Sequence, residues 1–293
     1  MRQPEAPTTK GPEAVRVWLL GGFRISVGPR NIEEGAWHLR KAAALVKVLA
    51  LSPGHRLHRE QAMDLLWPDL GKKAASNNLR GTLYAARKAL DPAEGPRYLA
   101  SEEGQLLLCP EGDLWVDVEA FEEFTSTARR SRDPAAYRAA IDLYTGDLLP
   151  EDRYEEWAEK HRRQLRESYL SLLLGLARLH EEREKYEPAI EALRKVVAAE
   201  PAREEAHTGL MRLYTLSGSK GEALSQYSRL KEALSTELDT EPVASSRTLR
   251  EEIAAGRLPP KEAHLSSSPP EGLPGTSKHN LPAPRTSFVG REQ

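Results

Sequence analysis

Residues 74–90 read AASNNLRGTLYAARKAL, and this stretch decides how the chain is interpreted. At about 100° per residue its apolar residues fall on one narrow side of a helix, namely Leu79, Leu83, Ala86 and Leu90. The opposite side carries amides, a phenol, cations and Gly81, a residue that allows close approach. Such groups hydrogen-bond base edges and phosphates in a major groove. The stretch therefore predicts a helix that packs by one side and reads DNA with the other.

The charge of the chain is distributed unevenly. The formal net charge is −2, but residues 1–109 hold 16 Lys and Arg against 11 Asp and Glu, whereas residues 110–293 hold 26 against 33. An asymmetry of this kind indicates that one half meets a polyanion. A solvated helix face is the alternative, but such faces usually mix signs to gain i,i+4 pairs. The segment between Asp69 and Asp91 has no acid and five cations: Lys72, Lys73, Arg80, Arg87 and Lys88.

The residues around this helix predict a compact α+β frame at 15–108. Residues 15–27 alternate like two short strands, and two helices are expected at 37–51 and 59–67. After the third helix, residues 98–100 and 105–108 flank Glu102-Glu103-Gly104, which is typical of a β-hairpin with glycine at a positive φ. Strands, three helices and a hairpin in this order predict a winged helix-turn-helix, in which the third helix enters the groove.

The second half predicts an all-α tetratricopeptide-like domain at 117–256. A shift of 34 residues superimposes apolar positions, for example Leu176 on Leu210 and Ala189 on Ala223, and 34 is the tetratricopeptide period. Turn residues follow the expected helices at Glu200-Pro201 and Ser217-Gly218-Ser219. A chance match between two amphipathic helices is the alternative. Further helices of the same stack are expected at 121–130, 134–144 and 155–180, since such arrays need several units.

Composition limits what else the chain can do. Residues 257–293 are rich in Pro and Ser, and we expect a disordered linker there. The single cysteine, Cys109, forbids an intrachain disulfide, and no apolar run or leader is present, so a cytoplasmic protein without membrane contact is expected.

Catalytic and metal-binding interpretations find little support in the sequence. His55 and His58 form the nearest approach to a metal pair, but no third ligand accompanies them, and Cys109 has no base beside it. The chain has no G-x-x-x-x-G-K-[ST] motif for a nucleotide. We therefore expect no enzyme activity, no cofactor and no metal site.

Both halves resemble a known family. Ser76–Leu90, within the frame 15–108, resembles the winged-helix output domain of OmpR/PhoB-type regulators and, more closely, the N-terminal domain of Streptomyces antibiotic regulatory protein (SARP) activators. Residues 118–256, with Asp147-Leu148-Leu149-Pro150 and Trp157, resemble the bacterial transcriptional activation domain of that family. The tail 281–292 is similar to the segment that opens the nucleotide-binding domain of larger members, which suggests a piece of a longer regulator.

This resemblance implies a sequence-specific transcriptional activator that binds promoter repeats as a homodimer and contacts RNA polymerase. One departure is the acidic wing tip, Glu102-Glu103, where basic residues are common. It motivates the alternative of a protein-interaction scaffold whose winged helix does not bind DNA. The residues expected to contact DNA are Asn77, Asn78, Arg80, Thr82, Tyr84, Arg87 and Lys88, with Lys72, Lys73 and Arg97 nearby.

Overall fold

The computed structural model describes residues 13–91 and 97–257. The linker expected at 257–293, and the match at 281–292, therefore lie outside the described residues except for Arg257. Among the described residues, none of the helices combines the length and apolar character needed to cross a bilayer.

The described part of the chain begins in a four-stranded sheet formed by β1 (Val15–Trp18), β2 (Arg24–Val27), β3 (Arg30–Asn31) and β7 (Leu114–Val116). Its order is β3-β2-β1-β7, with β7 parallel to β1 and the other neighbours antiparallel. The predicted alternation is confirmed, since Val15 and Val17 are buried on one side of β1. Strands β3 and β7 were not predicted, because segments of two or three residues are too short to show alternation.

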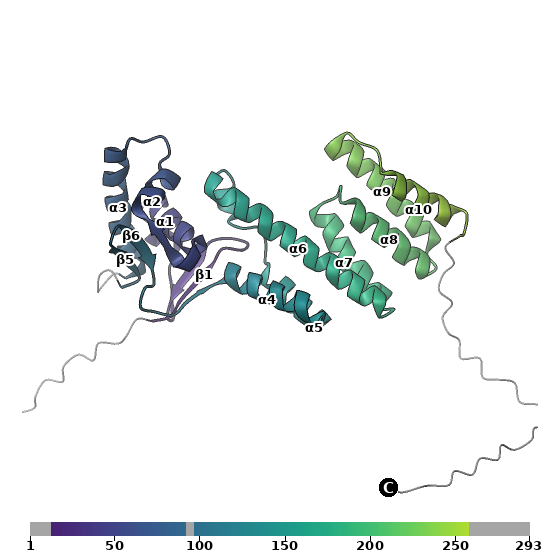
Figure 1. The fold of residues 1–293 in the computed structure, drawn as a ribbon, viewed down its shortest axis with the longest axis horizontal. Helices are drawn as coiled ribbons and strands as arrows, with labels where there is room; N and C mark the ends of the chain where they lie inside the picture. The colour runs from purple at the N-terminus through teal and green to yellow at the C-terminus, as the bar shows by residue number, and fades with distance from the viewer. Residues whose placement is uncertain (1–12, 92–96, 258–293) are drawn as a thin grey trace, which may run out of the picture. The chain divides into compact units, whose positions relative to one another are not determined.

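The three helices and the wing follow as predicted. They are α1 (Arg40–Leu51), α2 (Arg59–Leu66), α3 (Lys72–Leu90), β5 (Leu99–Glu102) and β6 (Gln105–Leu108), as Figure 1 shows. A third strand, β4 (Arg56–His58), joins the hairpin in the order β4-β6-β5. The first helix begins three residues later than expected, because Trp37 has a non-helical backbone and places its ring against Phe23, 5.6 Å away. This arrangement is a winged helix-turn-helix.

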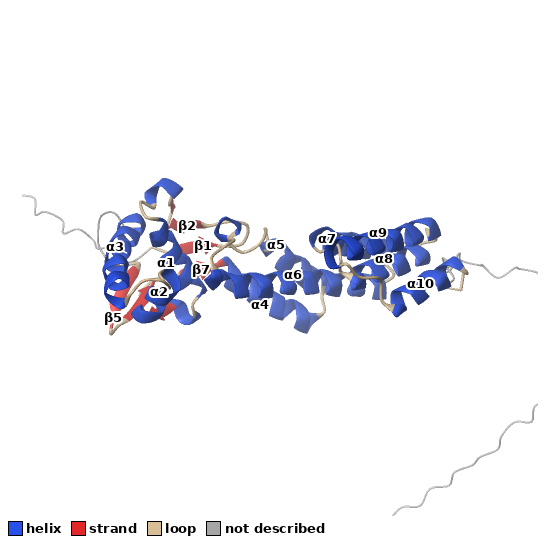
Figure 2. Ribbon diagram, turned by 90° about the horizontal axis from the view of Figure 1, so that it is seen from above, coloured by secondary structure: helices blue, strands red, loops and turns tan. Residues whose placement is uncertain are grey.

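Seven helices form the second part. Their bounds are α4 (Asp117–Ser131), α5 (Pro134–Leu143), α6 (Glu156–Glu182), α7 (Tyr186–Ala199), α8 (Glu204–Leu216), α9 (Lys220–Leu238) and α10 (Ala244–Ala254). Successive helices pack on one another, and Figure 2 shows α7, α8 and α9 side by side. The predicted repeat is confirmed: Ala189 in α7 and Ala223 in α9 are both fully buried, so each allows its neighbour to approach closely. The fold is tetratricopeptide-like.

The segment 145–152 joins this helical array to the first sheet. The amide of Leu149 donates to the carbonyl of Leu19 at 2.9 Å, and the amide of Gly21 donates to the carbonyl of Asp147 at 3.0 Å. The buried carboxylate of Asp117, at the start of α4, accepts the amides of Leu19 and Leu20, each at 2.9 Å. Burial raises the pKa of Asp117 despite these hydrogen bonds. One continuous apolar core runs from β1 through α1 and α3 into α4–α6, so the two parts pack as a unit.

Candidate DNA-binding surface

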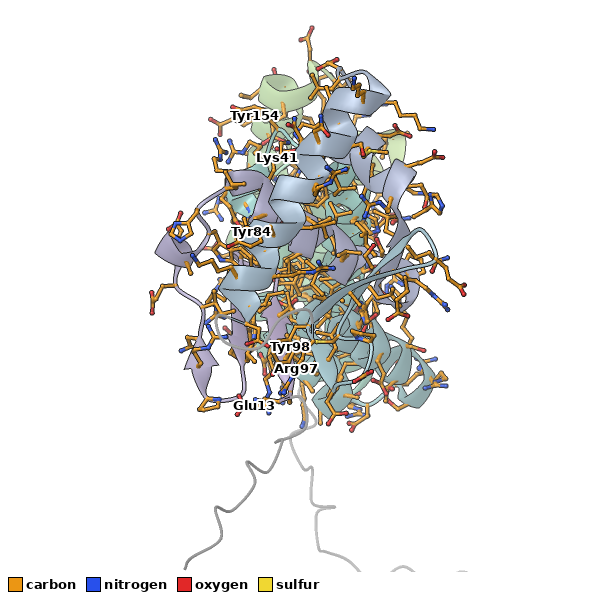
Figure 3. All side chains as sticks on the ribbon, turned by 90° about the vertical axis from the view of Figure 1, so that its left-hand side faces the viewer. Glu13, Lys41, Tyr84, Arg97, Tyr98 and Tyr154 are labelled. Atoms are coloured by element: carbon orange, nitrogen blue, oxygen red, sulfur yellow. The ribbon has the colours of Figure 1, made fainter. Side chains whose placement is uncertain are left out.

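Helix α3 packs by its apolar side and exposes its polar side. Leu79 and Ala86 are fully buried, whereas the side chain of Tyr84 is 70% exposed. Figure 3 looks onto α3 and shows Tyr84 on its outward surface. The other exposed predicted contacts on this helix are Asn77, Asn78, Arg80 and Lys88. These amides, cations and phenol are carried on about three turns of one helix, so they are presented as one rigid surface.

Gly81 lies in the middle of this exposed surface. A Cβ atom added at this position would meet no atom within 4 Å. Packing therefore does not require glycine here, and helix stability argues against it, because glycine costs about 1 kcal/mol relative to alanine in a helix interior. The exposed surface of α3 therefore has open space at Gly81.

Thr82 does not lie on the outward surface, which corrects the expectation that it faces DNA. Its side chain is only 3% exposed. Thr82 is about 60° from Leu79 around a helix of 3.6 residues per turn. The buried side of α3 is wider than the predicted stripe of leucines and Ala86, since Ala75 and Ala89 are buried on the same flank as Thr82. Thr82 therefore belongs to the packed side.

Arg87 has a structural contact that sequence reasoning did not anticipate. Its Nε–H donates to the carbonyl of Leu99 in β5 at 2.8 Å, and the side chain is half-buried. Arg30 reaches α3 from the first sheet and donates to the carbonyls of Ala89, at 3.3 Å, and Leu90. Cations at a helix C-terminus satisfy free carbonyls and oppose the negative end of the helix dipole. These two arginines fix α3 to the wing and to the first sheet.

The N-terminal end of α3 carries Lys72 and Lys73, both exposed. Lys72 Nζ lies 2.6 Å from Glu60 Oε1 of α2, and this hydrogen bond raises the pKa of Lys72 and lowers that of Glu60. Lys72 is thus already paired. Among the described residues, no acid pairs with Lys73, Arg80 or Lys88.

The wing has the expected turn and the expected acidic tip. Glu103 and Gly104 have φ of 47° and 81°, as a two-residue type I′ hairpin requires. Glu102 and Glu103 are exposed, and Arg97 is half-buried just before β5 (Figure 3). The wing thus offers an acidic tip in place of the basic one that phosphate binding favours.

Two cations beside the wing were missed by sequence reasoning. Arg56 is exposed on β4, and Arg59 at the start of α2 donates to the hydroxyl of Ser101 at 3.3 Å. Arg56 was not assigned because β4 was not recognised as a third strand, and the contact of Arg59 with Ser101 joins residues 42 positions apart. They place positive charge on the sheet behind the acidic tip.

The residues considered for metal binding or catalysis have structural contacts. His58 caps α2 by accepting the amide of Glu60 at 3.3 Å, and His55 Nε2 lies 3.3 Å from Glu119. Burial raises the pKa of the Cys109 thiol to about 12, so the reactive thiolate is suppressed. The Nδ1 atom of His55 is buried without a hydrogen-bond partner, and among the described residues no group of three His, Cys, Asp or Glu side chains is placed to hold a metal ion.

Comparison with protein families matches residues 116–254 to the family described as bacterial transcriptional activator domain. The regulatory protein AfsR of Streptomyces coelicolor is 27% identical over 286 residues, which cover 95% of this chain. The regulatory protein DnrI of Streptomyces peucetius is 25% identical over 227 residues, which cover 73% of this chain and 84% of DnrI. The chain spans 28% of the length of AfsR.

A solved structure shares the fold. Mycobacterium tuberculosis EmbR, determined in complex with a low affinity phosphopeptide, superimposes with a TM-score of 0.67 at 21% identity. The similarity covers 85% of this chain and 66% of the EmbR chain. At this identity the likeness concerns the fold, and it extends over both the winged helix and the helical array.

Proposed function

We propose that this chain, whose residues 116–254 match the bacterial transcriptional activator domain, is a SARP-type regulator that activates transcription by binding promoter DNA through α3. The observation that carries the proposal is the exposed polar side of α3, where amides and cations that have no acidic partner among the described residues surround Gly81 on a helix whose other side is buried. Such a helix fits a major groove about 12 Å wide. The similarity to AfsR and DnrI, both named regulatory proteins, supports the same function.

The exposed residues divide by chemistry into two roles. Asn77, Asn78 and Arg80 have the planar groups that form paired hydrogen bonds with adenine or guanine edges. Lys73 and Lys88 are point charges suited to phosphates, which position a protein without reading sequence. Tyr84, between them, offers a ring face and a hydroxyl. Arg87 and Lys72, which have partners in the protein, contribute indirectly by holding α3 to the wing and to α2.

The two parts of the chain have different roles in this proposal. In this proposal residues 15–108 bind DNA, and residues 117–256 contact RNA polymerase and a second protomer on neighbouring promoter repeats. The domain match at 116–254 supports the second role. The packed junction at Asp117 and 145–152 supports this proposal, because a rigid connection would fix residues 117–256 relative to the DNA that α3 binds.

A salt titration with matched variants tests the proposal. Fluorescence anisotropy of a labelled promoter duplex should show affinity that falls steeply with salt, by about 0.9 decade per decade of salt for each phosphate contacted. Lys88→Gln should lower both the affinity and this slope, the latter by about one unit. Lys195→Gln on α7, an exposed lysine distant in sequence from α3, is the control and should change neither.

Two outcomes of this titration would contradict the proposal. If the parent shows no salt-dependent binding to any promoter fragment of its own genome, the chain acts as a protein-interaction scaffold instead. If the parent binds but Lys88→Gln and Lys195→Gln behave alike, DNA binds elsewhere than on α3.

A further inference from the structure

A cavity of about 560 Å³ lies where the winged helix meets the helical array. Its walls come from β2 and the segment before it, from residues 32–37, from α1, and from the turn Pro150–Asp152 of the second part. We call it the junction pocket, and its polar and aromatic lining comprises Phe23, Arg24, Glu34, Trp37, Arg40, Lys47, Glu151 and Asp152. Its volume is in the range of small-molecule sites, about 300–1,000 Å³. No step of the proposed DNA binding uses it.

One wall of the junction pocket is the outward stripe of α1. Arg40, Ala43 and Lys47 are three and four residues apart, so they lie along the same side of the helix. At 1.5 Å per residue, Arg40 and Lys47 are separated by about 10 Å along the axis. Ala43 between them is small and only half-buried, which leaves the middle of the wall open. A flat molecule about two rings long fits this distance.

The two ends of the stripe differ in electrostatic state. At one end, the ammonium of Lys47 is neutralised by Asp152 Oδ2 at 2.5 Å and Glu151 Oε1 at 3.0 Å. At the other end, the guanidinium of Arg40 is exposed, and among the described residues no acid pairs with it. Arg40 is also the first residue of α1, where the helix dipole disfavours a cation. Neither an acidic partner among the described residues nor the helix dipole stabilises the charge of Arg40.

Aromatic rings flank the space between the two ends. Phe23 and Trp37 pack with centroids 5.6 Å apart, and both rings are only partly buried. Lys47 Nζ lies 4.7 Å from the Phe23 centroid, which fixes that ring on the acidic side. Exposed ring surface beside an unpaired guanidinium is a recognition pattern for an aromatic acid, since the rings bind by stacking and Arg binds carboxylates by paired hydrogen bonds.

We propose that the junction pocket binds a small aromatic carboxylic acid, with its ring against Trp37 and Phe23 and its carboxylate on Arg40. The wall formed by Glu151 and Asp152 belongs to the helical array, and the remaining walls belong to the first sheet and α1. A ligand there contacts both parts at once and stabilises their packed arrangement. The site is thus placed to carry a metabolite signal to the junction. It does not depend on whether α3 binds DNA.

The test uses the full chain and two fluorinated probes of matched shape, followed by ¹⁹F NMR. 5-Fluoroindole-3-acetate should bind saturably, and 5-fluoroindole-3-acetamide, which lacks the charge, should bind about tenfold more weakly. Arg40→Gln should weaken the acetate to the level of the amide and leave the amide unchanged. Arg163→Gln, at an exposed arginine of α6, is the matched control and should change neither. Thermal unfolding of each variant separates a local effect from a failure to fold.

A second variant tests the position of the ring. Ala43→Leu, which fills the middle of the wall, should abolish binding of both probes while the protein still folds. The proposal is overturned if the acetate does not saturate, if acetate and amide bind equally, or if Arg40→Gln matches Arg163→Gln. Displacement of the acetate by an unrelated DNA duplex would also overturn it, because the pocket would then be a phosphate contact.

Discussion

Lys47 Nζ of α1 lies 2.5 Å from Oδ2 of Asp152, and this pair joins the winged-helix part of the chain to the helical part. Lys47 is buried, with a side chain only 7% exposed. A buried cation requires partners, and both of its acids come from residues more than 100 positions later in the chain. The junction is therefore held by charge as well as by the shared core, and the two parts should unfold together.

Lys47→Met should destabilise the protein by about 3 kcal/mol, because removing one partner leaves a half-buried carboxylate without compensation. Lys41→Met is the control: its pair with Glu155, at 3.4 Å, is about one third exposed on both sides and should contribute less than about 1 kcal/mol. Urea unfolding followed by both circular dichroism and Trp fluorescence measures the loss. Equal losses for the two variants would show that the junction does not depend on Lys47.

Gly81→Ala should separate folding from DNA binding. The added methyl group meets no protein atom, so the helix should gain up to about 1 kcal/mol in the free energy of unfolding. The same methyl group should obstruct the close approach of a DNA backbone and weaken promoter binding. Gly35→Ala, outside α3 and also without a contact for the added Cβ, is the comparison for DNA affinity. A variant that is more stable and binds promoter DNA as tightly as the parent would remove Gly81 from the interface.

Arg87→Ala should weaken the packing of α3 against the wing and should not alter which bases are recognised. Loss of the hydrogen bond to Leu99 should lower the free energy of unfolding by about 1 kcal/mol. DNA affinity should fall by a similar factor on cognate and mutated promoters, since Arg87 positions α3 against β5. Anisotropy on a panel of single-base promoter variants measures this. A loss confined to one base pair would instead assign Arg87 a direct contact with that base.

The amphipathic pattern of 74–90 predicted α3 and its exposed side, because the core of a small domain forces a helix to bury its apolar side. It was wrong for Thr82, which is buried on the same flank as Ala75 and Ala89, and it did not anticipate the hydrogen bond from Arg87 to the carbonyl of Leu99. The contact of Arg87 depends on how β5 and α3 meet, and no local pattern encodes it. The pair of Lys47 with Asp152 was missed for the same reason, since it joins residues separated by 105 positions.

His180, at the end of α6, should make stability fall in mild acid. Its side chain is buried, and its Nε2 lies 3.2 Å from a nitrogen of Arg138, so the imidazole must be neutral to accept that hydrogen bond. Burial, followed by the charges of Arg138, Lys185 and Arg183, lowers the pKa of His180 below its ordinary value of 6.5. The unfolded chain therefore binds a proton at a higher pH than the folded protein does. The contribution of His180 to the free energy of unfolding is complete above about pH 6.5, and it is lost as the pH falls through the pKa of His180 in the folded protein.

His180→Gln keeps an acceptor for Arg138 and removes the titration. Urea unfolding at pH 7.5 and 5.5 should therefore show a smaller loss for His180→Gln than for the parent. His38→Gln, at an exposed histidine, should keep the pH dependence of the parent. An identical loss in the parent and in His180→Gln would mean that the acid sensitivity arises elsewhere, since only the titration of His180 distinguishes the two proteins.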